Sequence, residues 1–77
     1  NPFNPTTNIT FALPKSGVVT LKVYDVLGKE VASLVNSFTN AGTHVVPFDA
    51  SSLSSGVYIY KITTGEFTDS KKMVLIK

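Results

Sequence analysis

The chain has 77 residues, which is enough for one domain with a single hydrophobic core. Seven lysines, five acidic residues and no arginine give a formal net charge of +2, and the lysines are too scattered to predict nucleic-acid binding. Cysteine is absent, which excludes disulfides and thiolate metal sites. No run of apolar residues exceeds four, so we expect no membrane insertion.

The first five residues contain two prolines, which hold the backbone extended and discourage a helix. This opening reads as a cut through a longer polypeptide, so we expect a further domain upstream. Residues 1–7 are expected to be the end of a linker and the start of the domain. Residues 8–77 are expected to form a single domain.

Apolar and polar residues alternate over residues 9–13 and again over residues 19–24, which predicts two half-buried strands. The segment Pro-Lys-Ser-Gly at residues 14–17 predicts a turn between them. The segment Asp-Val-Leu-Gly at residues 25–28 predicts a second tight connection, because Asp can bond its own backbone and Gly can adopt a positive φ. Residues 30–36 then continue as a less regular strand.

A turn at residues 40–42 precedes a strand that has Val46 and Phe48 on one face. A serine-rich loop follows at residues 49–56, and its Leu53 is expected to pack underneath the loop. These segments extend the pattern of short strands separated by turns.

The most strand-like segment covers residues 57–62, and Thr64-Gly65 then opens the final hairpin. The last strand, at residues 71–77, is apolar and flanked by lysines. Its alternation predicts Met73 and Leu75 on one face and their neighbours Val74 and Ile76 on the other, so that both faces are covered.

Six or seven short strands with turns about every 8–12 residues predict an all-β fold. We expect an antiparallel β-sandwich of Ig-like or fibronectin-like type, with a small open barrel as the alternative.

The sequence shows no constellation typical of catalysis or metal binding. His44 is the only histidine, so a zinc site would have to be completed by carboxylates alone. The three aspartates lie in or next to predicted turns, where Asp commonly bonds the backbone. We therefore expect no enzyme activity, no cofactor and no metal site.

Three tyrosines leave a binding function open. Tyr24, Tyr58 and Tyr60 could form a sugar-stacking platform on the sheet, as in carbohydrate-binding β-sandwich modules. Strand tyrosines are more often half-buried core residues whose hydroxyl reaches water, which is the interpretation we favour. A plain Ig-like structural spacer in a larger extracellular protein is a further alternative.

Five short motifs in sequence carry a resemblance to a known family. They are NPFNPTT (1–7), VYDVLGKEV (23–31), AGTH (41–44), SGVY (55–58) and KKMV (71–74). In this order and spacing the chain resembles the type A C-terminal sorting domain of type IX secretion, found in Bacteroidota and related bacteria. It is also similar to the Ig-like domain of flagellar hook-capping proteins.

The resemblance implies a non-catalytic module that directs an upstream cargo domain through the outer-membrane translocon. The cargo would pass through the periplasm and then be released or attached to the cell surface. The implied partners are the type IX translocon and shuttle proteins, and a surface sortase that removes the domain in many relatives. We expect the domain to be a monomer.

The resemblance also implies two candidate recognition elements. The first is the glycine turn, with Gly28, Lys29 and Val31. The second is the terminal segment, with Lys71, Lys72, Met73, Val74 and Lys77. The alternative for the glycine and the valines is purely structural. Gly28 would then be required only for its backbone conformation, and Val31 and Val74 would only pack in the core. Alternation makes the lysines better candidates for contact with a receptor than the apolar residues of the last strand.

Overall fold

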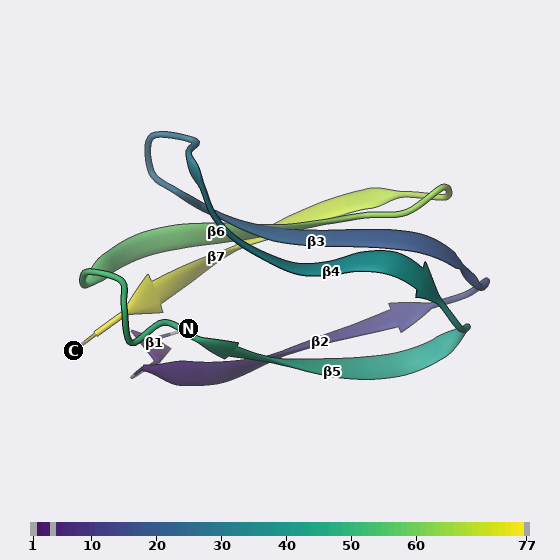
Figure 1. The fold of residues 1–77 in the computed structure, drawn as a ribbon, viewed down its shortest axis with the longest axis horizontal. Helices are drawn as coiled ribbons and strands as arrows, with labels where there is room; N and C mark the ends of the chain where they lie inside the picture. The colour runs from purple at the N-terminus through teal and green to yellow at the C-terminus, as the bar shows by residue number, and fades with distance from the viewer. Residues whose placement is uncertain (1, 4, 77) are drawn as a thin grey trace.

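Two β-sheets packed face to face make up the structure, a computed structural model that describes residues 2–3 and 5–76, with side chains described for residues 5–76 (Figure 1). The described residues form seven strands and no helix. The strands are β1 (Pro2–Phe3), β2 (Thr6–Leu13), β3 (Gly17–Asp25), β4 (Glu30–Thr39), β5 (Gly42–Asp49), β6 (Gly56–Thr63) and β7 (Thr68–Leu75). The predicted all-β fold is confirmed.

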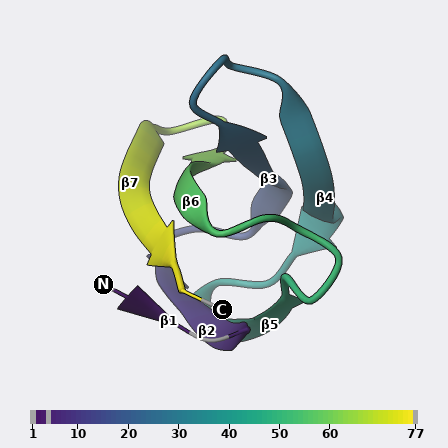
Figure 2. The same ribbon diagram turned by 90° about the vertical axis from the view of Figure 1, so that its left-hand side faces the viewer.

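The larger sheet has five strands in the order β1-β7-β6-β3-β4, and the smaller sheet pairs β2 with β5. The strand pairs described in the two sheets are antiparallel, except that β1 runs parallel to β7. In the end-on view, β2 and β5 lie across the interior from β3 and β6 (Figure 2). Two separate sheets confirm the predicted sandwich and not the barrel.

The hydrophobic core lies between the sheets and is centred on β3. Val19, Leu21 and Val23 of this strand are completely shielded from solvent, because alternate side chains of a strand point to the same face. The other core residues are Ile9, Leu13, Phe48, Ala50, Tyr58, Ile62, Met73 and Leu75. Burying one large apolar side chain in such a core stabilises the fold by about 1.5–3 kcal/mol.

The strand β4 is irregular, as its sequence predicts, but it is longer than the expected residues 30–36. Its pairing with β3 contains two register shifts, and β-bulges of this kind increase the local twist of a strand. Its apolar residues Val31, Leu34 and Val35 are half-buried and pack against the core. The apolar side chains of this strand therefore contact the core but stay partly open to solvent.

The serine-rich loop between β5 and β6 is tied to the rest of the domain. The N–H of Ala50 donates to the carbonyl of Pro5 over 2.9 Å, and the N–H of Leu53 donates to the carbonyl of Ala50 over 2.9 Å. Leu53 packs against the core, as predicted. The hydroxyl of Tyr58 donates to the carbonyl of Ser54 over 2.7 Å, so the loop is held by both backbone and side-chain contacts.

Candidate functional site

The two predicted recognition elements lie at the same end of the five-stranded sheet. Both β3 and β7 run antiparallel to β6, so the turn that follows β3 and the end of β7 face the same direction. In Figure 1 the β3–β4 turn rises above the sandwich at the end where β7 terminates. A single partner could therefore contact both elements.

The β3–β4 turn is shaped by Asp25. Its Oδ1 accepts hydrogen bonds from the N–H of Leu27 over 2.9 Å and from the N–H of Lys29 over 3.0 Å. The carbonyl of Asp25 accepts from the N–H of Gly28 over 3.0 Å, and its own N–H donates to the carbonyl of Lys29 over 2.9 Å. Gly28 has a φ of +83°, a conformation that favours glycine. The turn is thus fixed by one carboxylate and one glycine.

Two apolar side chains occupy the apex of this turn. Val26 is 68% exposed and Leu27 is 90% exposed. Turn apices usually carry small or polar residues, so two aliphatic side chains here need another explanation. The sequence prediction named Gly28 and Lys29 and missed these two, although apolar residues between a turn-forming Asp and Gly were a visible signal.

The predicted residues of the turn have different surroundings. Lys29 is exposed, while Val31 is half-buried and packs against the core. A Cβ added to Gly28 would meet no atom within 4 Å, so only the backbone conformation requires glycine there. Of these three residues, Lys29 alone presents an exposed side chain.

The terminal segment splits between the two faces of the large sheet. Met73 is buried, Val74 is half-buried, and Lys71 and Lys72 are both exposed. Lys71 is in register with Tyr60 and has the parity of Met73, so it lies on the inner face at the open side of the sandwich. Lys72 lies on the outer face. Lys77 is outside the described residues.

Coverage of the last strand is one-sided. Met73 and Leu75 are buried, as alternation predicts, but Ile76 is 50% exposed. The expectation that both faces would be covered is therefore wrong at Ile76. The small sheet covers only the inner face of the large one, which leaves the outer face open to solvent.

The outer face next to the β3–β4 turn forms one continuous surface. Tyr24, Ile59 and Lys72 are register partners across β3, β6 and β7. A shallow hollow beside them is lined by Tyr24, Asp25, Val26, Gly28, Ile59 and Lys61. We call this region the turn surface. It consists of the two apex residues, the three residues of the row and the exposed lysine of β6, namely Val26, Leu27, Tyr24, Ile59, Lys72 and Lys61.

The charge of this end of the outer face is positive. Glu30 forms an ion pair with Lys22 over 3.0 Å, and the hydrogen bond and charge of Glu30 raise the pKa of Lys22. The Oδ1 of Asp25 already accepts two N–H groups of its own turn. By contrast, Lys61 and Lys72 form no ion pair with any described residue.

The tyrosines do not form a row on one face. Tyr58 is only 7% exposed and donates its hydroxyl to the loop carbonyl of Ser54. Tyr60 is half-buried against the core, whereas Tyr24 lies on the outer face. This arrangement supports the interpretation of Tyr58 and Tyr60 as core residues.

Three other features of the described part of the chain bear on chemistry. The ring of His44 stacks on that of Phe11 with centroids 5.4 Å apart, and its Nε2 lies 2.7 Å from the carbonyl oxygen of Asn40. Nowhere in residues 5–76 do three His, Asp or Glu side chains gather in a way that could hold a metal ion. None of the described residues belongs to a helix with the length and apolarity needed to cross a bilayer.

Comparison with known proteins agrees with this architecture. The chain is similar in structure to the Ig1 domain of mouse SynCAM 2, with a TM-score of 0.50, 13% sequence identity, and coverage of 96% of this chain and 85% of that one. This likeness confirms the Ig-like fold. A search of curated proteins returned no match. The family model of secretion system C-terminal sorting domains matches residues 1–77, the whole sequence. The chain therefore belongs to the family of type IX secretion C-terminal sorting domains.

Proposed function

We propose that this domain directs a cargo protein through the type IX outer-membrane translocon, for release or for attachment at the cell surface. Membership of the sorting-domain family over all 77 residues is the observation that carries the proposal. The cargo precedes residues 1–7, passes through the periplasm, and is delivered by the translocon and its shuttle proteins. A surface sortase then removes the domain where the cargo is to be attached.

The domain acts as a folded signal without catalysis of its own. A receptor that reads a folded domain needs side chains held in fixed positions, and an ordered turn on a sandwich supplies them. Lys29 and Lys72 are the exposed groups that we assign to recognition at the turn end, with Lys71 and Lys77 as further contacts. Gly28 sets the shape of the turn.

The apolar residues of the predicted site hold the strands that carry the exposed lysines. Val31 packs against the core and Met73 is part of it, while Val74 is half-buried beside β1. Their role in this proposal is to position the exposed lysines. The proposal thus separates the residues that are read from those that hold them in place.

A reporter fusion tests the proposal. Residues 1–77 are fused to the C-terminus of a periplasmic reporter in a cell with a working type IX system and in the same cell lacking the translocon. We expect the reporter at the surface or in the medium only when the translocon is present. A reporter that stays in the periplasm with its domain folded would contradict the proposal.

Point variants separate recognition from folding at the terminal segment. Deleting residues 73–77 is expected to abolish export, but it also removes Met73 and Leu75 from the core. The variants Lys71→Gln and Lys72→Gln leave the core intact, and protease resistance of the fusion checks that it stays folded. We expect the larger loss of export from Lys72→Gln, because Lys72 shares the outer face with the turn.

A further inference from the structure

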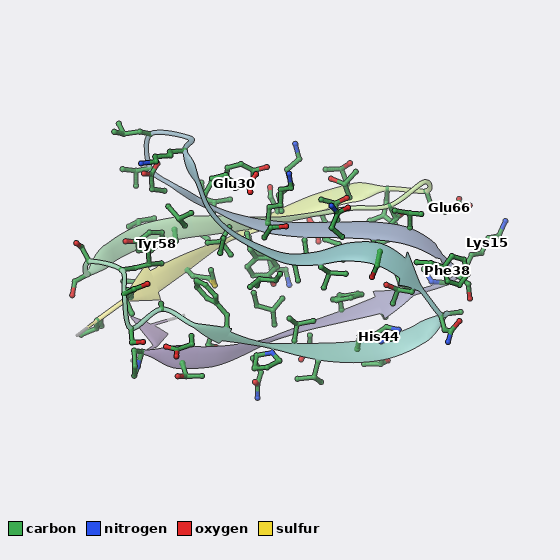
Figure 3. The ribbon with its side chains drawn as sticks, viewed as in Figure 1. Lys15, Glu30, Phe38, His44, Tyr58 and Glu66 are labelled. Atoms are coloured by element: carbon green, nitrogen blue, oxygen red, sulfur yellow. The ribbon has the colours of Figure 1, made fainter. Side chains whose placement is uncertain are left out.

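We propose that the turn surface docks a protein segment of the secretion system that carries an apolar side chain flanked by carboxylates. This inference rests on the proposed function and adds the chemistry of the partner. Figure 3 shows the β3–β4 turn standing clear of the sandwich, with Glu30 at the start of β4 just below it.

Folding alone does not account for the apolar apex. Val26 and Leu27 are 68% and 90% exposed, so they contribute little burial to the domain. The backbone of the turn is held by Asp25 and Gly28, whose roles do not depend on the residues between them. Exposed aliphatic side chains that are not buried on folding can be buried by a partner that covers them.

The hollow beside the apex gives the surface a concave part. Its lining includes the large side chains of Tyr24, Val26 and Ile59 together with the charged residues Asp25 and Lys61. Ile59 is 38% exposed, although it lies in the middle of a sheet, between β3 and β7. A projecting Leu27 next to an apolar hollow with a charged edge suits a partner that both receives one side chain and inserts another.

Charge selects an acidic partner. Lys72 ends the row on β7 and Lys61 lies two residues from Ile59 on β6, and neither lysine forms an ion pair with a described residue. The two nearby carboxylates, of Asp25 and Glu30, are already engaged by the turn and by Lys22. Carboxylates beside the apolar group of the partner would therefore match this surface.

The same observations argue against other occupants. A second copy would place these lysines against one another in a symmetric contact, and like charges disfavour such an interface. A flat anionic membrane could receive the apex but could not fill the hollow. A protein segment can cover the apex residues, fill the hollow and place carboxylates beside the lysines.

The opposite end of the outer face provides a matched control. Val18 and Phe38 are register partners there and are 62% and 66% exposed, compared with 68% and 90% for Val26 and Leu27. Figure 3 shows Phe38 at the end of β4 far from the β3–β4 turn. The double variants Val26→Ser/Leu27→Ser and Val18→Ser/Phe38→Ser remove similar apolar area from the two ends.

Export of the reporter fusion is measured for both double variants. We expect the apex variant to lower export about tenfold or more, as loss of one well-buried aliphatic contact would do. The control variant should leave export unchanged, and both should unfold at nearly the temperature of the unsubstituted fusion. Equal export by the apex variant and the unsubstituted fusion would overturn the inference while leaving the proposed function intact. Failure of the unsubstituted fusion to be exported would instead overturn the proposed function.

Photo-crosslinking identifies what covers the apex. A benzophenone amino acid replaces Leu27 in one fusion and Val18 in another, and the crosslinked peptides are sequenced. We expect Leu27 alone to crosslink to a secretion-system segment that has Asp or Glu beside an apolar residue. Crosslinks from Leu27 to a second copy, to lipid, or to a segment without acidic residues would overturn the inference. Sedimentation of the 77-residue chain with vesicles of 30% phosphatidylglycerol in phosphatidylcholine checks the lipid case, and lipid binding that is lost in the apex variant would also count against it.

Discussion

The β3–β4 and β6–β7 turns use the same device with different residues at the apex. In the first, Oδ1 of Asp25 accepts from two N–H groups, at 2.9 and 3.0 Å. In the second, Oγ1 of Thr64 accepts from the N–H groups of Glu66 and Phe67, at 3.0 and 3.1 Å. One side-chain oxygen near the start of each turn therefore determines its shape.

The apices differ in what they present to solvent. The β6–β7 turn exposes Gly65 and Glu66, and its Phe67 packs against the core. The β3–β4 turn exposes Val26 and Leu27. Because a polar apex suffices for the second turn, the apolar apex of the first is not a requirement of turn formation. The comparison supports assigning Val26 and Leu27 to a contact outside the domain.

Removing the two capping oxygens tests whether the turns are equivalent. Asp25→Ala loses two hydrogen bonds to a charged acceptor, and we expect a loss of about 1–2 kcal/mol in the free energy of unfolding. Thr64→Val removes a neutral hydroxyl that accepts two N–H bonds and donates a longer one, of 3.4 Å, to the carbonyl of Phe67, and it should cost about 0.5–1 kcal/mol. Each kcal/mol corresponds to roughly 4–8 °C in Tm for a domain of this size, which thermal denaturation resolves. Asp25→Asn keeps an acceptor oxygen and serves as the control, and equal losses for Asp25→Ala and Asp25→Asn would contradict the capping role.

The glycines of the two turns are expected to respond differently to alanine. Gly28 has a φ of +83°, so Gly28→Ala should cost roughly 1 kcal/mol of backbone strain. Gly65 has no positive φ and no atom within 4 Å of an added Cβ, so Gly65→Ala should change stability by less than about 0.5 kcal/mol. Urea denaturation of the two variants measures the difference. If Gly65→Ala proved the more destabilising, the backbone argument at Gly28 would be wrong.

The two ion pairs beside the turns are expected to show the smallest difference in their contribution to stability. Lys22 and Glu30 are 3.0 Å apart, whereas Lys15 and Glu66 are 3.7 Å apart and more exposed. The pKa of Lys22 is raised above its ordinary 10.5, mainly by its hydrogen bond to Glu30 and then by the charge of that residue. We expect Glu30→Gln to lower this pKa, as NMR titration of the Lys22 side chain would show.

The sign of the pH dependence follows from this direction. The folded pKa of Lys22 lies above the unfolded value. The stabilisation of the fold by the Lys22–Glu30 ion pair is therefore complete below a pH of about 10.5 and is lost as the pH rises through the folded pKa. Glu66→Gln is the matched control and should leave stability unchanged, since surface ion pairs of this kind contribute little. An alkaline unfolding curve that is identical with and without Glu30 would exclude the assigned role.

Local alternation was enough to predict most of the sandwich from sequence. Val19, Leu21 and Val23 follow the period of two and are buried as expected, and the Asp-Val-Leu-Gly segment forms the expected turn. The end of β4, beyond residue 36, was missed because Ser37, Phe38 and Thr39 do not continue an alternation of apolar residues. Parallel pairing of β1 with β7 joins residues more than seventy positions apart, which a local pattern cannot show.

The candidate site was predicted less completely than the fold. The sequence indicated both the β3–β4 turn and the terminal lysines, but their meeting at one end depends on the strand order. Alternation puts Lys71 and Lys72 on opposite faces, but which of them lies on the outer face follows from pairing with β6. The exposure of Val26 and Leu27 depends on what packs over the turn, and only the structure supplies that. Recognition by these residues stays a prediction.

The parallel pairing of β1 with β7 places the first described strand beside the last. Pro2 is in register with Val74 and Phe3 with Leu75, and because the strands are parallel a linker that runs back along β1 could join them into a closed ring. Opening that ring at the exposed Gly65–Glu66 apex would give a circular permutant with the same sandwich. Its β7 would then be internal to the polypeptide, with the outer face unchanged. Such a rearranged chain separates two meanings of a C-terminal signal, namely a free chain end and a folded surface that happens to lie near one.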